Sequence, residues 1–198
     1  MADREQMFAA EICERKIPGH WEGDLVVGPG NSALITLVER VSRFTLLGRL
    51  PGARDSETVI DKLTQMVESL PEAVLRSLTW DQGSEMACHH LLDEYFADGI
   101  FFAPPASPWL RGTNENTNGL LRQYFPKGSD LRSYSLDDLR AVEDRINRRP
   151  RKRLSWRSPA HAMEAELAGR TRQRCDDHAN PPSNPPAARG SVFRRRRH

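Results

Sequence analysis

The sequence predicts one α/β domain, in which a mixed five-stranded sheet carries helices on both faces. Three runs rich in β-branched residues open the chain and are separated by short turns, which is typical of an antiparallel meander. Helical and strand-like patterns then alternate, which implies crossover connections and parallel pairing in the second half. With 198 residues, 38% of them hydrophobic, the chain is long enough to bury a core of ordinary size.

The first three strands are expected at residues 20–27, 33–41 and 44–50. The first strand reads HWEGDLVV, and the Gly-Pro-Gly-Asn sequence after it indicates a tight turn. Two polar residues separate the second strand from the third, and Pro51-Gly52 ends the meander. Because tight turns join neighbouring strands, we expect these three to pair antiparallel.

An amphipathic helix is expected at residues 56–70, with Asp55 or Ser56 as its N-cap, because apolar side chains recur there at helical spacing. The later elements are expected as a strand at 78–80, a helix at 86–96, a strand at 100–103, a helix at 136–147 capped by Ser135, and a helix at 159–167. This order divides the chain into a leader or remnant at 1–16, a folded core at 17–168 and a disordered basic tail at 169–198.

The stretch from Pro104 to Lys127 begins as a proline-rich loop and becomes helical near Thr113. Thr113 or Asn114 is expected to cap this helix, and Pro126 ends it. Three polar side chains fall on one face of the helix: Glu115, Asn118 and Arg122. A carboxylate, an amide and a guanidinium in a row suit a metal ligand followed by contacts to a polyanion.

Two further carboxylates lie where the predicted sheet can bring them near Glu115. Asp24 is inside the first strand, and Asp81 ends the fourth strand before a glycine turn, at a position where α/β sheets bind ligands. Three such carboxylates can converge on Mg²⁺ or Mn²⁺, which prefer hard oxygen ligands. From composition alone, ordinary surface acids are the alternative. Glu22 and Glu85 are accessory candidates, for which a structural role is the alternative.

The net charge of +2 conceals an uneven distribution of charge. Basic residues concentrate between 140 and 157, and again after residue 169, where eight arginines stand against two aspartates. A basic segment beside a carboxylate site suits a nucleic-acid substrate. A solvated helix face is the alternative, and for the tail by itself we prefer that interpretation.

Cysteine usage and hydropathy indicate the compartment. Cys13, Cys88 and Cys175 are scattered and odd in number, which argues against a disulfide framework and for a reducing cytoplasm. No apolar run approaches the about 18–20 residues that a membrane span needs, and the N-terminus is too charged for a signal peptide. The sequence Cys88-His89-His90 lacks a second ligand pair at zinc spacing, so we assign it to a helix.

Five blocks of the sequence stand out: GHWEGDLVVG at 19–28, TLVERVSRF at 36–44, LTWDQGSEM at 78–86, SPWLRGTNENTNGLLRQYFPKG at 107–128 and INRRPRKRLSWRSPAHAM at 146–163. In this order they resemble the catalytic domain of bacterial insertion-sequence transposases, specifically the insertion sequence thirty (IS-thirty) family. The resemblance covers roughly residues 17–167. It implies the integrase-core, ribonuclease-H-like fold that the family has.

The resemblance also implies an Asp-Asp-Glu triad of Asp24, Asp81 and Glu115 that holds Mg²⁺ or Mn²⁺, as two ions. Such ions serve in-line attack at phosphorus, here DNA cleavage at the element ends and joining of the freed 3′-hydroxyl to a target, without a covalent protein intermediate. Contacts to DNA are expected from Asn118, Arg122, Lys127, Arg148, Arg149, Arg151, Lys152 and Arg153. The implied partners are element-end and target DNA and further copies of the chain, forming a homo-oligomer on DNA in the bacterial cytoplasm, at the nucleoid, with no membrane partner.

The chain also departs from the family pattern. The family usually carries a polar Asp-Pro-His-like run and a glutamine in the loop before the triad glutamate, whereas this loop contains Pro104-Pro105-Ala106 and Leu110. Family members carry an N-terminal helix-turn-helix region that recognises the terminal repeats, and this chain starts almost at the catalytic domain. Two other hypotheses therefore stay open: a truncated, non-catalytic remnant that binds DNA or full-length transposase, and a general metal-dependent nuclease.

Overall fold

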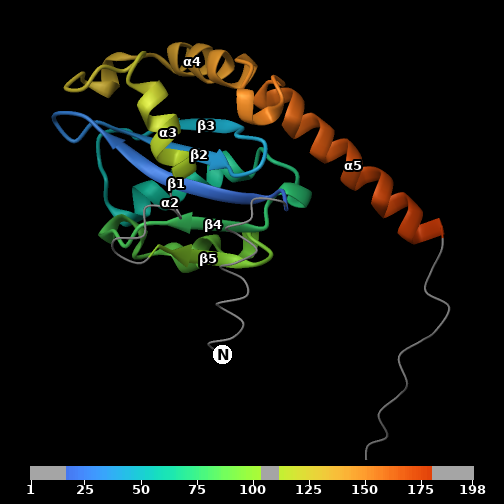
Figure 1. The fold of residues 1–198 in the computed structure, drawn as a ribbon. Helices are drawn as coiled ribbons and strands as arrows, with labels where there is room; N and C mark the ends of the chain where they lie inside the picture. Colours follow the sequence, from blue (N-terminus) through green and yellow to red (C-terminus); the bar gives the residue numbers. More distant parts are fainter. Residues whose placement is uncertain (1–16, 104–111, 180–198) are drawn as a thin grey trace, which may run out of the picture.

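The computed structural model describes residues 17–103 and 112–179 of the chain. Within them, five strands form one mixed sheet in the order β3-β2-β1-β4-β5 (Figure 1). The strands are β1 His20–Val27, β2 Ala33–Glu39, β3 Thr45–Arg49, β4 Ser77–Trp80 and β5 Gly99–Phe102. The first three pair antiparallel, whereas β4 pairs parallel with β1 and β5 pairs parallel with β4. The predicted meander and the parallel second half are thereby confirmed.

The register between β1 and β4 decides which side chains share a face of the sheet. His20 pairs with Ser77 and Glu22 pairs with Thr79, and His20 Nδ1 lies 2.7 Å from Ser77 Oγ. Trp21 points the other way, into the larger of two hydrophobic clusters. Because side chains alternate along a strand, Trp21 and Leu78 share the apolar face, whereas the paired residues His20, Glu22, Ser77 and Thr79 form a polar part of the other face.

The apolar face is covered by α2, Ser56–Val67. Its buried residues join the same cluster as Trp21 and close one side of the sheet. Asp55 caps the helix as predicted, because its side chain accepts a hydrogen bond from the Thr58 N–H at 2.9 Å.

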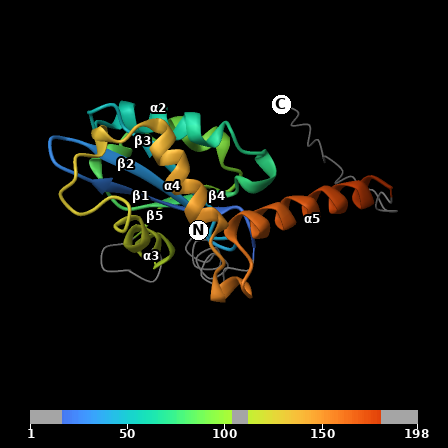
Figure 2. The same ribbon diagram turned by 90° about the horizontal axis from the view of Figure 1, so that it is seen from above.

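The other face carries α3, Gly112–Leu121. The helix α4, Leu136–Arg148, runs across the β3 end of the sheet (Figures 1 and 2) and packs into the cluster on this face. The smaller cluster lies here and joins residues of β1 and β2 to Leu121, Phe125 and Leu139. Ser135 caps α4 as expected, in a capping box with Asp138. Helices therefore cover both faces of the sheet, as the fold class requires.

One helix also protects an edge of the sheet. The Asn147 side chain accepts from the Thr45 N–H at 2.9 Å and donates to the Thr45 carbonyl at 2.8 Å. The Glu143 carboxylate accepts from the Leu47 N–H at 2.7 Å. These side chains of α4 bind outward-facing backbone groups of β3, which is the edge strand. Burial raises the pKa of Glu143 to about 7, although the Leu47 bond opposes that shift.

Two expectations about helices are wrong. Residues 86–96 do not form an α-helix but contribute to two short 3₁₀ helices, Ser84–Met86 and His89–Tyr95. Their buried side chains are Met86 and Leu92, too few for an amphipathic stripe. The last helix, α5, runs over Pro159–Ala179 rather than ending near residue 168 in a disordered tail. No proline interrupts this helix, since the next one after Pro159 comes at position 181.

Several other expectations fall on residues 1–16, 104–111 and 180–198, which lie outside the described residues. These include the N-terminal leader or remnant, the end of the basic tail, and the loop in which the sequence departs from its family.

Candidate active site

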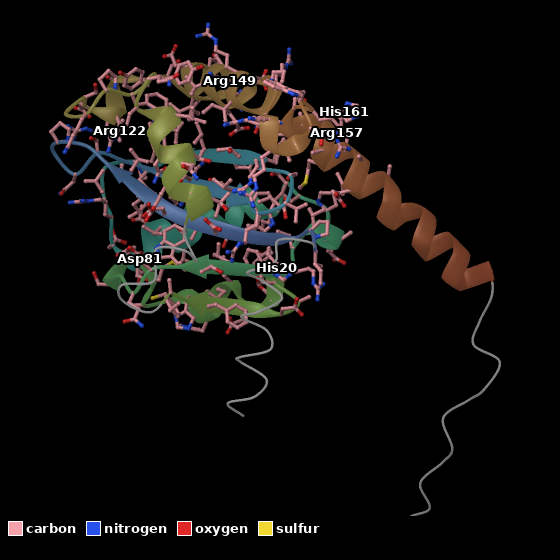
Figure 3. The ribbon with its side chains drawn as sticks, viewed as in Figure 1. His20, Asp81, Arg122, Arg149, Arg157 and His161 are labelled. Carbon is pink, nitrogen blue, oxygen red and sulfur yellow. The ribbon has the colours of Figure 1, made fainter. Side chains whose placement is uncertain are left out.

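Asp24 lies in β1, and Asp81 directly follows the neighbouring parallel strand β4 at a corresponding level of the sheet. In the pairing of β1 with β4, His20 lies opposite Ser77 and Glu22 lies opposite Thr79. The partner in β4 is thus always 57 residues later in the sequence. The same offset takes Asp24 to Asp81, which directly follows β4 (Figure 3). Asp24 is two residues from Glu22 and so shares its face. Two predicted ligands are thus at adjacent strand positions, and both are half-buried.

The buried carboxylate of Glu22 holds the first turn of α3. Its Oε2 accepts from the Thr113 N–H at 3.0 Å and from the Asn114 N–H at 2.9 Å. These amides belong to the N-terminal turn, where N–H groups have no partner within the helix. A carboxylate there is also favoured by the helix dipole. The prediction that Thr113 or Asn114 caps α3 is wrong, because both lie inside a helix that begins at Gly112.

Glu22 is itself held by an ion pair inside the protein. Its Oε1 lies 2.9 Å from Nε of Arg40, and each of the two side chains is 1% exposed. A buried carboxylate needs compensating charge and hydrogen bonds, and Glu22 obtains both from Arg40 and the two amides. The start of α3 is therefore fixed against β1 by contacts that water does not reach.

Two asparagines fasten α3 further along. The Thr36 hydroxyl donates to Asn114 Oδ1 at 3.0 Å. Nδ2 of Asn118 donates to Asp24 Oδ2 at 2.9 Å, and the Leu25 N–H donates to Asp24 Oδ1 at 2.9 Å. Asn118, for which a DNA contact is predicted, thus donates to a predicted metal ligand and orients its carboxylate.

Glu115 lies in the first turn of α3 and is exposed. It is three positions before Asn118, so it belongs to the neighbouring turn on the same side of the helix. No group of three His, Cys, Asp or Glu side chains in residues 17–103 and 112–179 is arranged to hold a metal ion. The structure therefore sets Asp24 and Asp81 at corresponding positions of neighbouring strands and attaches the Glu115 helix over β1, and these described residues do not form a three-carboxylate cluster. The donor chemistry, carboxylate oxygens alone, fits Mg²⁺.

The predicted DNA contacts lie toward the C-terminal end of α3 and beyond it. In Figure 3 Arg122 lies beside the C-terminal end of α3 and Arg149 lies at α4, whereas Asp81 lies toward the opposite end of α3. Arg151 is half-buried and donates to the Ile146 carbonyl at 3.4 Å. Arg122 is also half-buried, and the remaining predicted cations are exposed: Lys127, Arg148, Arg149, Lys152 and Arg153. Arg148 Nη2 lies 3.4 Å from Asp144 Oδ2, a contact of two exposed side chains that leaves it open to solvent.

The remaining candidates have structural roles. Glu85 accepts from the Trp80 indole N–H at 3.2 Å. His89 Nδ1 lies 3.0 Å from the Met86 carbonyl, and its ring meets Phe102 edge-on, so it belongs to the packed turn. Among the described residues, no helix has the length and apolar character to cross a membrane.

Comparison with known proteins agrees with this architecture. A family model described as integrase core domain matches residues 14–101. The chain is 48% identical over 162 residues to the transposase for insertion sequence element IS1086 of Cupriavidus metallidurans, covering 81% of this chain and 48% of that protein. It is 47% identical over 157 residues to transposase InsI for insertion sequence element IS30A of Escherichia coli, covering 79% and 41% respectively.

Residues 14–101 thus match an integrase core domain, and about four-fifths of the chain is similar to part of insertion-sequence transposases. The identity falls to 32% over 143 residues for the transposase of insertion sequence element IS4351 of Bacteroides fragilis, of which the chain covers 43%. The chain spans less than half the length of these relatives.

Sequence reasoning did not find the main structural residue of this integrase core. Glu22 was an accessory candidate, but nothing in the sequence pointed to Arg40 as its partner or to α3 as what it holds. One signal was available, because alternation along β1 puts Glu22 on the same face as Asp24, where a buried acid needs a partner.

Proposed function

We propose that this integrase core is the catalytic part of a transposase that cleaves DNA at the ends of an insertion sequence and joins the freed 3′-hydroxyl to target DNA. The observation that carries the proposal is the β1–β4 register, which sets Asp24 level with Asp81 on the face where α3 bears Glu115. The identity to transposases over about four-fifths of the chain supports the same reaction class.

In this proposal Asp24, Asp81 and Glu115 hold two Mg²⁺ or Mn²⁺ ions. Proteins with an integrase core generally depend on divalent metal ions. When bound, the ions activate the attacking hydroxyl and stabilise the leaving oxygen during in-line displacement at phosphorus. Carboxylate oxygens are the ligands these ions prefer, which supports the choice of this triad.

The neighbouring residues prepare the ligands for this work. Asn118 and the Leu25 N–H bind different oxygens of the Asp24 carboxylate, so its orientation is set before any ion arrives. Glu22, with Arg40, fixes the start of α3 and hence the position from which Glu115 extends. Because the ligands are already arranged, the reaction step requires little free energy of reorganisation.

DNA is the proposed partner, bound through phosphate contacts from the exposed cations and from Arg122 and Arg151. Contacts of this kind position the duplex without reading its sequence, and they weaken as salt increases. We further propose that copies of the chain assemble on the element ends, in the bacterial cytoplasm at the nucleoid.

A strand-transfer assay tests the proposal. Purified chain with Mn²⁺ and pre-cleaved element ends is expected to give joined product, and Asp81→Asn to abolish it. Asp93→Asn is the matched control, because Asp93 is an exposed acid away from the site and its loss leaves joining unchanged. DNA binding in a gel shift without any product, under conditions where a longer relative joins strands, rejects the catalytic proposal in favour of a non-catalytic DNA-binding role.

A further inference from the structure

An exposed tryptophan stands on the loop between α4 and α5. Trp156 is 71% exposed, more than any other large hydrophobic side chain in the described residues, whereas Trp21 and Trp80 are fully buried. A large aromatic ring normally lies in a core or at an interface, because an exposed ring leaves a large apolar area in contact with water. The position of Trp156 therefore points to a partner.

The loop that presents Trp156 is rigidly built. The Arg151 carbonyl accepts from the Leu154 N–H at 2.9 Å and from the Trp156 N–H at 3.0 Å, and the Arg151 N–H donates to the Arg157 carbonyl at 3.0 Å. Leu154, within the loop, is buried. Ser155 and Trp156 have φ angles of 54° and 64°, in the left-handed region that residues other than glycine avoid. The surrounding contacts hold this strained turn and keep the ring outward.

The surroundings of the ring are strongly basic. Between residues 145 and 163 the chain has no Asp or Glu, and it has seven cationic residues: Arg145, Arg148, Arg149, Arg151, Lys152, Arg153 and Arg157. Burial and then the charge of Arg149 lower the pKa of Arg151, as expected where cations crowd together. An anionic partner relieves this repulsion. A second copy docking through the same patch brings like charges together.

We propose that Trp156 stacks on an unpaired base of the DNA substrate while Lys152, Arg153 and Arg157 contact the flanking phosphates. The inference rests on the proposed transposase function. It adds that the loop binds DNA whose bases are unpaired. Stacking on an aromatic ring tolerates any base, and basic side chains beside it follow the backbone. In Figure 2 the loop and α3 project toward the same side of the sheet, and Figure 3 places Arg157 at the start of α5, so one DNA strand can approach both.

Binding measured in EDTA tests the loop separately from catalysis. Fluorescence anisotropy compares the whole chain on three DNAs of equal length: a single strand, a duplex with a frayed end and a fully paired duplex. Trp156→Asn removes the ring while asparagine tolerates the left-handed backbone. We expect about tenfold weaker binding to the single strand and the frayed end, unchanged binding to the duplex, and recovery with Trp156→Phe.

Two control variants separate stacking from charge and from folding. Lys152→Ala is expected to weaken binding to all three DNAs equally and to lower the slope of log affinity against log salt by about one. Ser155→Gly relieves the backbone strain and keeps the ring, so it should bind as the wild type does. Circular dichroism melting confirms that each variant is folded.

Three outcomes overturn the inference: equal affinities of Trp156→Asn and wild type for every DNA, no DNA binding by the wild type, or loss of a wild-type dimer in Trp156→Asn by sedimentation. The last outcome identifies the ring as a contact between copies. Preference for unpaired DNA in a chain that joins no strands keeps the inference and rejects the catalytic proposal, so the two failures are distinguishable.

Discussion

Replacing Glu22 with alanine is expected to destabilise the protein by about 4 kcal/mol. The substitution removes the carboxylate that pairs with Arg40, and losing one partner of a buried ion pair costs about 3–5 kcal/mol. It also removes the acceptor for the Thr113 and Asn114 amides, and hydrogen bonds to a charged group contribute about 1.5–3 kcal/mol each. The two effects share one carboxylate and overlap, so we expect a total near the first figure rather than the sum.

Urea denaturation followed by circular dichroism measures this loss. With a slope of about 2 kcal/mol per M for a domain of this size, the midpoint should fall by about 2 M. A second pair of variants assigns the cause. In Glu22→Gln with Arg40→Met, the amide oxygen can still accept from α3 and no charge stays buried, so much of the stability should return. In Glu22→Ala with Arg40→Met, α3 lacks its acceptor, so stability should stay lower.

Measured stabilities and joining rates can contradict the role assigned to Glu22. A midpoint shift below about 0.5 M for Glu22→Ala means that the buried pair and the helix contact contribute little. Equal stability of the two double variants means that Glu22 does not act on α3 at all. If the stable Gln-Met variant also joins strands at the wild-type rate, the charge at position 22 is dispensable for placing Glu115.

Two other substitutions test how the sheet is packed, one at its β3 edge and one within β1. The pKa of Glu143 is raised to about 7 from 4.5, so this group lowers folding stability progressively as pH rises from about 4.5 through 7, by at most about 3 kcal/mol. Glu143→Gln keeps an acceptor for Leu47 and should become more stable than wild type above pH 7, and equal urea midpoints of the two proteins at pH 5 and pH 8 contradict this. Gly23→Ala places a Cβ 2.1 Å from the Trp80 ring, so thermal melting should show a loss of about 3 kcal/mol, and additional truncation of Trp80 to Leu should recover part of it; an unchanged melting temperature rejects the clash.

The sheet was predictable because its signals are local. Alternation and tight turns located β1 to its end residues, and the crossover pattern gave the parallel pairing of β4. The start of α3 was not predictable in the same way, because the carboxylate that accepts from its Thr113 amide is that of Glu22, 91 positions earlier. The 3₁₀ segments also escaped prediction, since helical spacing over residues 86–96 does not reveal how few of those side chains find a core.

Each of the four residues Trp21-Glu22-Gly23-Asp24 has its own structural task, so this part of β1 tolerates few substitutions. The Trp21 indole donates to the Val74 carbonyl at 2.7 Å and anchors β1 on the apolar face. Gly23 leaves the space that Trp80 fills on that same face. On the polar face Glu22 holds α3, and Asp24 receives Asn118 from that helix. Alternation thus assigns two positions to support the strand and two to the site. A one-residue shift of β1 would exchange the sets and lose both.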